Sequence, residues 1–148
     1  MRSANEMILI VEDNSDDRDL LARAFRKAKV ETPLQFAVDG DEAILLLSET
    51  ISVELQPRPI VILLDLKLPR RTGFEVLEWI KRQEVLRRVP VIILTSSREN
   101  IDLERAYDLG ANSYLVKPAR PDELLHMVEQ IDAYWLGLNA AAITPRLG

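Results

Sequence analysis

Six polar side chains that could do chemistry together lie at the ends of short apolar runs in this sequence. They are Glu12, Asp13, Asp65, Thr95, Ser96 and Lys117. Asp65 is the most telling of them, because it ends the apolar run IVILL, residues 60–64, where it has no helix to cap. An acidic pair such as Glu12-Asp13, by contrast, could simply favour the positive end of a helix dipole. The set as a whole supplies carboxylates, hydroxyls and an ammonium group.

Three carboxylates a few ångströms apart need a counter-charge. Each close pair repels by about 4 kcal/mol at an effective dielectric constant of about 20, so the group requires a cation or a bound proton. An all-oxygen site with open positions suits Mg²⁺, which keeps several waters and usually binds together with phosphate. With a lysine beside the cation, such a site could neutralise a phosphoryl group while an aspartate attacks it. The product would be an acyl phosphate on Asp65.

The runs that carry these side chains have the length and composition of buried strands. Five runs are predicted as strands, at residues 7–11, 34–38, 60–64, 91–94 and 113–116. Several are apolar on both faces, which is typical of a parallel sheet covered by helices on both sides. Because the carboxyl ends of parallel strands lie at one edge, the polar residues that follow four of these runs are expected to converge there.

Amphipathic stretches follow each of the five runs and are predicted as helices. The first begins after Asn14-Ser15, a capping pair that leads into several aspartates. Another, GFEVLEWIKR at residues 73–82, repeats apolar side chains every three residues, and the last, residues 121–135, opens with Pro121 in its first turn. Strands that alternate with helices predict a single α/β domain.

The composition limits the number of domains, the kinds of partner and the cellular location that we expect. A chain of 148 residues, 47% hydrophobic and 29% charged, fits one compact domain. Its formal charge of -5 argues against a nucleic-acid partner. Cysteine is absent, so disulfides and thiolate metal sites are excluded. The opening MRSANEMILIVEDN has too short an apolar stretch for a signal peptide or a membrane span, and we therefore expect a cytoplasmic protein with no membrane contact.

The site residues resemble the pattern of the response-regulator receiver domain. The resemblance is carried by Glu12-Asp13, the lone aspartate of LLDLKLP, Thr95 with two small residues after it, and Lys117-Pro118, and it spans roughly residues 6 to 135. It implies a flavodoxin-like, doubly wound sheet of five parallel strands in the order 2-1-3-4-5, with five helices. It also implies a single-domain response regulator of a two-component phosphorelay, which accepts a phosphoryl group from a histidine kinase and changes conformation to signal.

The resemblance implies a role for each acidic residue. Asp65 would accept the phosphoryl group, and Asp13, Asp65 and the main-chain carbonyl of Lys67 would bind Mg²⁺ directly. Glu12 would hold a metal-bound water. The protein would then be no general enzyme, because it would catalyse only its own phosphorylation and dephosphorylation.

The resemblance also implies a phosphoryl-binding and switching group. Lys117 would pair with the phosphoryl oxygens, and Thr95, beside Ser96, would move to bind them. Tyr114 occupies the position of the family's rotating switch aromatic, although a half-buried strand tyrosine is an alternative. Lys67 and Ser97 lie where family members tune spontaneous dephosphorylation.

Other classes of protein fit the sequence less well. A haloacid-dehalogenase-like phosphatase also uses an aspartate nucleophile with Mg²⁺, but its second acid is replaced here by Lys67, which cannot exchange protons readily near neutral pH. A receiver-like binding module that is not phosphorylated would usually lack one of the five site residues. Nucleotide-binding glycine motifs do not follow the first predicted strand.

The phosphodonor must be another protein. The only histidine, His126, falls off the apolar stripe of the last predicted helix, where it is expected to face solvent. Two further stretches resemble stand-alone regulators encoded beside bacterial and cyanobacterial phytochromes. They are LLDLKLPRRTGFEVLEWIK and the YWL near the end of the sequence, and the resemblance implies a phytochrome-type histidine kinase as the phosphodonor.

We divide the chain into a receiver domain, residues 6–135, and a C-terminal tail, residues 136–148. The tail is either disordered or an apolar strip that supports a homodimer or a kinase contact.

Overall fold

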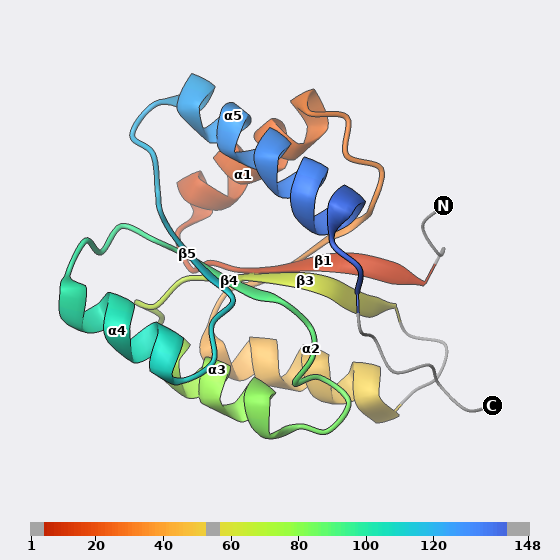
Figure 1. Ribbon diagram of the computed structural model, residues 1–148, viewed down its shortest axis with the longest axis vertical. Coiled ribbons are helices and arrows are strands. Elements are labelled where there is room, and N and C mark those ends of the chain that lie inside the picture. The colour runs from red at the N-terminus through yellow and green to blue at the C-terminus, as the bar shows by residue number, and fades with distance from the viewer. Residues whose placement is uncertain (1–4, 53–56, 142–148) are drawn as a thin grey trace.

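The computed structural model describes residues 5–52 and 57–141 and contains one parallel sheet with helices on both faces (Figure 1). The strands lie in the order β2-β1-β3-β4-β5. Their bounds are Glu6–Val11 for β1, Leu34–Ala37 for β2, Arg58–Leu64 for β3, Val91–Thr95 for β4 and Ser113–Val116 for β5. The helices are α1 (Ser15–Lys27), α2 (Gly40–Ser52), α3 (Gly73–Arg82), α4 (Asn100–Asp108) and α5 (Pro121–Ile131), followed by a π-helical segment, η1 (Asp132–Leu138). The predicted fold and strand order are confirmed.

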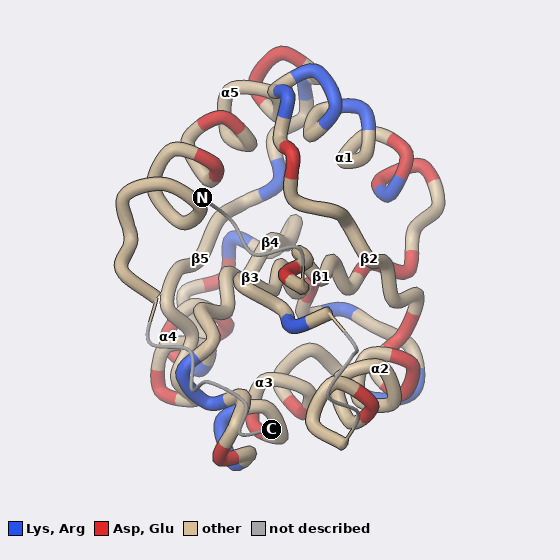
Figure 2. The backbone as a smooth tube through the Cα atoms, turned by 90° about the vertical axis from the view of Figure 1, so that its right-hand side faces the viewer, with Lys and Arg blue, Asp and Glu red and all other residues tan. Residues whose placement is uncertain are grey.

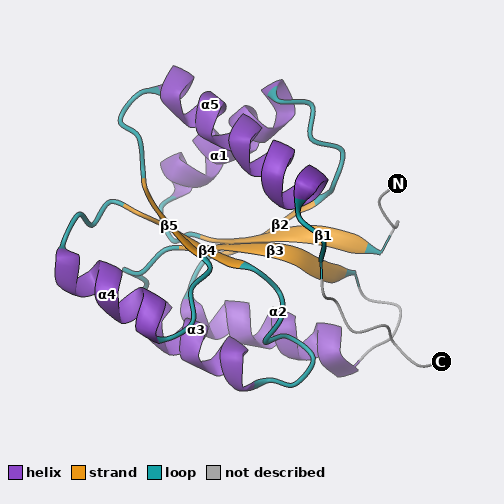
Figure 3. Cartoon of the chain, in the orientation of Figure 1, coloured by secondary structure: helices purple, strands orange, loops and turns teal. Residues whose placement is uncertain are grey.

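Two apolar cores lie on opposite faces of the sheet. Helices α1 and α5 cover one face, and α2, α3 and α4 cover the other (Figure 3). Successive side chains of β1 alternate between them, so that Leu9 packs in the α2–α4 core while Ile8 and Ile10 pack in the α1–α5 core. Charged residues lie mostly on the helices and connecting loops around the sheet (Figure 2). Because the central strands are buried on both faces, polar side chains can reach solvent only beyond the strand ends.

Local sequence signals set the helix starts nearest the sheet edge. Asn14 caps α1, with its side chain accepting a hydrogen bond from the N–H of Asp17. Thr72 and Glu75 form a reciprocal capping box at the start of α3. These caps fix where α1 begins after β1 and where α3 begins after β3. Both helix starts lie next to the predicted site.

The C-terminal helical region continues beyond the predicted helix end at residue 135. Regular α-helix stops at Ile131, and the wider π-helical turns of η1 carry the chain to Leu138. Within η1, Leu136 is buried in the α1–α5 core, whereas Leu138 is 80% exposed. Residues 136–138 of the predicted tail are thus helical, and residues 142–148 lie outside the described part of the chain.

Over residues 5–52 and 57–141, we find no helix with the length and apolar character needed to cross a lipid bilayer.

Candidate functional site

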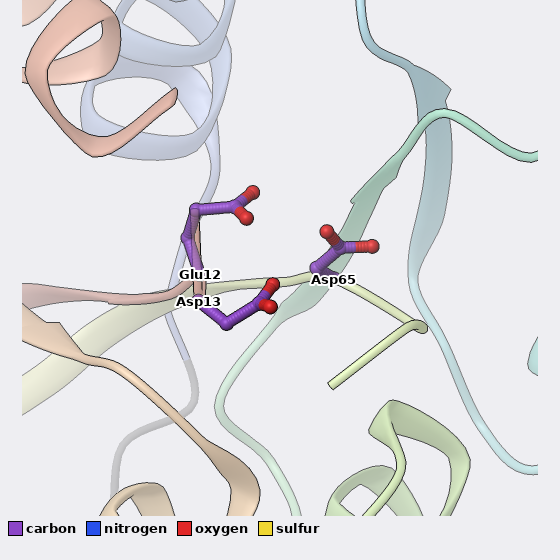
Figure 4. A group of neighbouring side chains, drawn as sticks. All are labelled: Glu12, Asp13 and Asp65. Carbon is purple, nitrogen blue, oxygen red and sulfur yellow. The ribbon is translucent and has the colours of Figure 1, made fainter. Parts of the chain in front are cut away.

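The predicted acidic residues meet at the carboxyl edge of the sheet. One carboxylate oxygen each from Glu12, Asp13 and Asp65 lies within 4.8 Å of the others. Figure 4 shows Glu12 and Asp13, just after β1, extending toward Asp65 at the end of β3. The two strands are neighbours, and the N–H of Asp65 donates to the carbonyl of Val11 at 3.1 Å. Pairing of β1 with β3 therefore brings the three acids together.

Lys117 reaches this cluster from the end of β5. Its N–H donates to the carbonyl of Thr95 at 2.8 Å, which extends the β4–β5 pairing to the edge of the sheet. Its ammonium nitrogen, Nζ, lies 2.6 Å from Glu12 Oε1 and 2.9 Å from Asp65 Oδ2. Asp17, in the first turn of α1, contributes another carboxylate at 3.0 Å. One lysine thus bridges acids from three parts of the chain.

The surroundings change the proton affinities of two of these groups. Burial raises the pKa of Glu12 to about 7, although hydrogen bonds from Lys117 and from the N–H of Asn14 oppose the rise. Burial alone would lower the pKa of Lys117, but hydrogen bonds to Glu12, Asp65 and Asp17 outweigh it and raise that pKa well above the usual value. Lys117 therefore stays charged at any physiological pH, while Glu12 can change its protonation near neutrality.

The arrangement of donors fits a hard divalent cation. All three clustered side chains offer oxygen, the ligand type that Mg²⁺ and Mn²⁺ accept. Glu12 and Asp65 are buried, whereas Asp13 is exposed and leaves one side of the cluster open to water. Lys117 supplies a single positive charge to a group that includes four carboxylates once Asp17 is counted. When these acids are ionised, the cluster retains enough negative charge to attract a divalent cation.

The main chain after Asp65 also contacts its carboxylate. The N–H of Lys67 donates to Asp65 Oδ1 at 3.3 Å, so the two oxygens of Asp65 face different donors. The side chain of Lys67 is exposed. The position that would carry an acid in a dehalogenase-type phosphatase therefore holds a solvent-facing lysine.

The hydroxyl residues converge on the loop between β4 and α4. Thr95 is fully buried and its Oγ1 accepts a hydrogen bond from the N–H of Ser97 at 3.4 Å, while Ser96 is exposed. The Ser97 hydroxyl donates to Asp102 Oδ2 at 2.6 Å, and the Tyr114 hydroxyl donates to the Ser97 carbonyl at 3.1 Å. Tyr114 is half-buried against the α2–α4 core. Ser97 is thus the point where this loop is held to both α4 and β5.

Sequence reasoning missed several residues that support the site. Asp17 is one of the aspartates that follow Asn14-Ser15, where the sequence predicts only a favourable interaction with the helix dipole, yet it pairs with Lys117. Arg18 Nη1 donates to the carbonyls of Glu12 and Asp13, at 2.9 Å each. The spacing along the sequence could have indicated the Arg18 contacts. A side chain in the first turn of α1 can fold back over the end of β1, which lies five or six residues earlier. The sequence around Asp102 gives no indication of its hydrogen bond with Ser97.

A doubly wound parallel sheet that carries an acidic cluster and a lysine at its carboxyl edge has the architecture predicted above for a receiver of the two-component type. The family model described as the response regulator receiver domain matches residues 8–129, and the chain belongs to this family. The predicted class of protein is confirmed, and the phosphatase alternative finds no support in this match.

Curated relatives and solved structures agree with that assignment. The chain is 44% identical over 135 residues to the probable methanogenesis regulatory protein FilR2 of Methanothrix harundinacea, covering 90% of this chain and 85% of the relative. It is 37% identical over 131 residues to response regulator Rcp1 of Synechocystis, covering 88% and 89%. The Mn²⁺-bound form of Rcp1 superposes with a TM-score of 0.82 at 36% identity, covering 92% and 98%. The phosphorylated cyanobacterial phytochrome response regulator RcpA superposes with a TM-score of 0.84 at 34% identity, covering 94% and 99%.

Proposed function

We propose that this protein is a phosphorylation-dependent switch in which Asp65 accepts a phosphoryl group from a phosphohistidine of a partner histidine kinase. Receiver domains of two-component systems act with such kinases. The observation that carries the proposal is the position of Asp65, which lies 2.9 Å from Lys117 Nζ and shares a 4.8 Å cluster with Glu12 and Asp13. This is the charge environment that phosphoryl transfer to a carboxylate requires.

Asp65 is the nucleophile in this proposal. One of its oxygens bonds to phosphorus as the phosphorus–nitrogen bond of the donor breaks, and the donor imidazole keeps that electron pair and takes up a proton. The N–H of Lys67 and the ammonium of Lys117 hold the carboxylate in one orientation. Lys117 then pairs with a phosphoryl oxygen, because its raised pKa keeps it cationic. Both contacts reduce the reorganisation needed during transfer.

We assign the metal site to Mg²⁺. Asp13, Asp65 and the main-chain carbonyl of Lys67 would hold the ion directly, and Glu12 would hold it through a water molecule. A bound divalent cation offsets the negative charge of the phosphoryl oxygens. The all-oxygen donor set and the open side at Asp13 support this choice, as does the Mn²⁺-bound form of the relative Rcp1.

Phosphorylation would act on the rest of the molecule through Thr95, Ser96 and Tyr114. A phosphoryl group adds about -1.5 to -2 charge and strong acceptors, so it draws the Thr95 hydroxyl away from the Ser97 N–H. Ser97 also holds Asp102 and Tyr114, and a shift of this loop therefore changes the surface of α4 and β5.

We further propose a phytochrome-type histidine kinase as the partner. The similarity to Rcp1 and to the phytochrome response regulator RcpA supports it. The receiver unit would span residues 6–135 and work in the cytoplasm without nucleic acid, catalysing only its own phosphorylation and dephosphorylation. Residues 136–148 would serve as a tail, in which the exposed Leu138 offers an apolar contact for a homodimer or for the kinase.

Acetyl phosphate tests the central proposal directly. We expect the wild-type protein to gain the mass of one phosphoryl group when it is incubated with acetyl phosphate and Mg²⁺, and Asp65→Asn to gain none. Equal labelling of the two proteins would remove Asp65 from this role. Multiple turnovers on phosphomonoesters would restore the phosphatase alternative, and a phytochrome kinase that labels itself but never this chain would exclude that partner.

A further inference from the structure

Two adjacent ion pairs join the loop that follows Asp65, residues 66–72, to the start of α2. Arg70 Nε lies 3.4 Å from Asp39 Oδ2, and Arg71 Nε lies 2.8 Å from Asp41 Oδ1. Asp39 is itself fixed, because its other oxygen accepts a hydrogen bond from the N–H of Glu42 at 2.7 Å. We call Asp39, Asp41, Arg70 and Arg71 the arginine clamp. It connects the loop to a helix end that contributes nothing to the acidic cluster.

Close backbone approaches hold the same loop near its end. A Cβ atom added at Gly40 would lie 2.3 Å from the carbonyl oxygen of Arg71, so only glycine fits beside the clamp. A Cβ atom at Gly73 would lie 2.1 Å from the carbonyl oxygen of Asp65, and the Gly73 N–H donates to the Leu66 carbonyl at 2.9 Å. The loop is therefore pressed against α2 on one side and against Asp65 on the other.

The loop also contains a strained residue. Arg70 has a φ of 69°, in the left-handed region that a residue with a Cβ rarely adopts. Such a conformation persists where the surrounding contacts hold it, and it is concentrated at functional sites. The guanidinium of Arg70, whose side chain is 68% exposed, pairs with Asp39, whose side chain is 18% exposed. The residue with the strained backbone is thus also one of the two arginines of the clamp.

We propose that the arginine clamp is a positioning element for the metal and phosphoryl site. By holding residues 66–72 in this strained shape, it keeps the main chain of Lys67 against Asp65, with the Lys67 N–H on Asp65 Oδ1. The Lys67 carbonyl, a metal ligand in the function proposed above, belongs to the same short segment. This inference rests on that function for its effect on Mg²⁺, but its effect on the loop is independent of it.

The test measures the loop and the metal separately. Asp39→Asn with Asp41→Asn removes both ion pairs, and asparagine at position 39 retains the oxygen that accepts from the Glu42 N–H. We expect faster amide hydrogen exchange at residues 66–72 of the metal-free variant and unchanged exchange in the strands. Because exposed ion pairs are individually weak, we expect the Mg²⁺ dissociation constant to rise about two- to fivefold for each pair lost. Calorimetric titration measures this constant.

A matched control and a rescue sharpen the result. Glu78→Gln breaks the exposed ion pair with Arg82 within α3 and should change neither measurement. The charge-reversed pair Asp41→Arg with Arg71→Asp should recover most of the affinity that Asp41→Asn loses. If the double variant does not fold, the single variant Asp41→Asn tests the proposal by the same two measurements. It should fold, because Asp41 and Arg71 are both about half-exposed and neither caps a helix.

Three results would overturn the proposal. They are an unchanged Mg²⁺ affinity with unchanged loop exchange, a loss of affinity equal to that of Glu78→Gln, and faster exchange spread evenly over the whole sheet, which indicates general destabilisation. A wild-type protein that binds no Mg²⁺ and takes up no phosphoryl group would instead refute the proposed function. The exchange rates of residues 66–72 would still test the clamp in that case.

Discussion

The ammonium group of Lys117 lies 2.9 Å from Asp65 Oδ2, although 52 residues separate the two along the chain. They approach each other across the carboxyl edge of the sheet, from β5 and β3, with β4 between these strands. The same ammonium group contacts Glu12 and Asp17, so it pairs with three of the four carboxylates at this edge. The structure therefore couples the stability of the fold to the residues that we propose carry its function.

Removal of Lys117 should destabilise the metal-free protein. Lys117→Met leaves the buried carboxylates of Glu12 and Asp65 without their cation, and breaking such a buried pair costs about 3 kcal/mol of unfolding free energy. Urea unfolding at pH 8 measures the loss, and added Mg²⁺ should restore part of it. Arg120→Ala, which breaks an exposed pair with Asp122, should stay within about 0.5 kcal/mol of wild type. Equal effects of the two substitutions would contradict this assignment.

Mg²⁺ affinity should fall as the pH is lowered through neutrality. Burial raises the pKa of Glu12 to about 7, so below that pH a proton occupies the carboxylate and competes with the cation. Above it, Glu12 is ionised and the affinity should level off. Titrations between pH 6 and pH 8 should give a weakening of up to about tenfold per pH unit on the acid side, since one proton is displaced. Glu12→Gln should bind Mg²⁺ more weakly and lose most of this dependence; an unchanged profile in that variant would assign the titration to another group.

Gly73→Ala should damage both stability and the site. The new Cβ would lie 2.1 Å from the carbonyl oxygen of Asp65, so the backbone has to shift at a cost of about 1–3 kcal/mol. Gly137→Ala is the matched control, because its nearest neighbour, Asp132 O, lies at an ordinary 3.5 Å and alanine favours the helical conformation. Thermal unfolding should therefore shift in opposite directions for the two variants. A neutral Gly73→Ala would show that the contact with Asp65 relaxes freely.

The hydrogen bond from Tyr114 to Ser97 should be worth about 1 kcal/mol. Tyr114→Phe removes only the hydroxyl, so the apolar packing of the ring is kept while the loop between β4 and α4 loses its link to β5. Unfolding experiments measure the cost, and amide exchange at Ser97 reports the local loosening. Tyr107→Phe alters a tyrosine that is 48% exposed on α4 and should leave Ser97 unaffected. The assignment fails if both variants loosen Ser97 alike.

The sequence predicted the parts of this protein that depend on apolar periodicity. Runs such as IVILL marked the strands, and parallel order then required Asp65 and Lys117 to share an edge. The contacts that side chains make across that edge could not be predicted from the sequence. The pairing of Asp17 with Lys117 depends on how α1 packs beside α5 over the sheet. The clamp brings Arg71 to Asp41 across 30 residues with no local signal. The π-helical turns after Ile131 were also missed, since a change of pitch barely alters the apolar pattern. The catalytic roles themselves stay predictions.

The order of the strands has a consequence for the newly made chain. Lys117 follows β5, which is synthesised after the other four strands of the sheet and lies at its edge. Until β5 pairs with β4, Lys117 is not held in the position from which it contacts Asp65 in the folded protein. If Asp65 is the acceptor, incomplete molecules are poor substrates for the kinase. Phosphorylation would then mark only chains that have finished folding, so a half-made regulator could not transmit a signal.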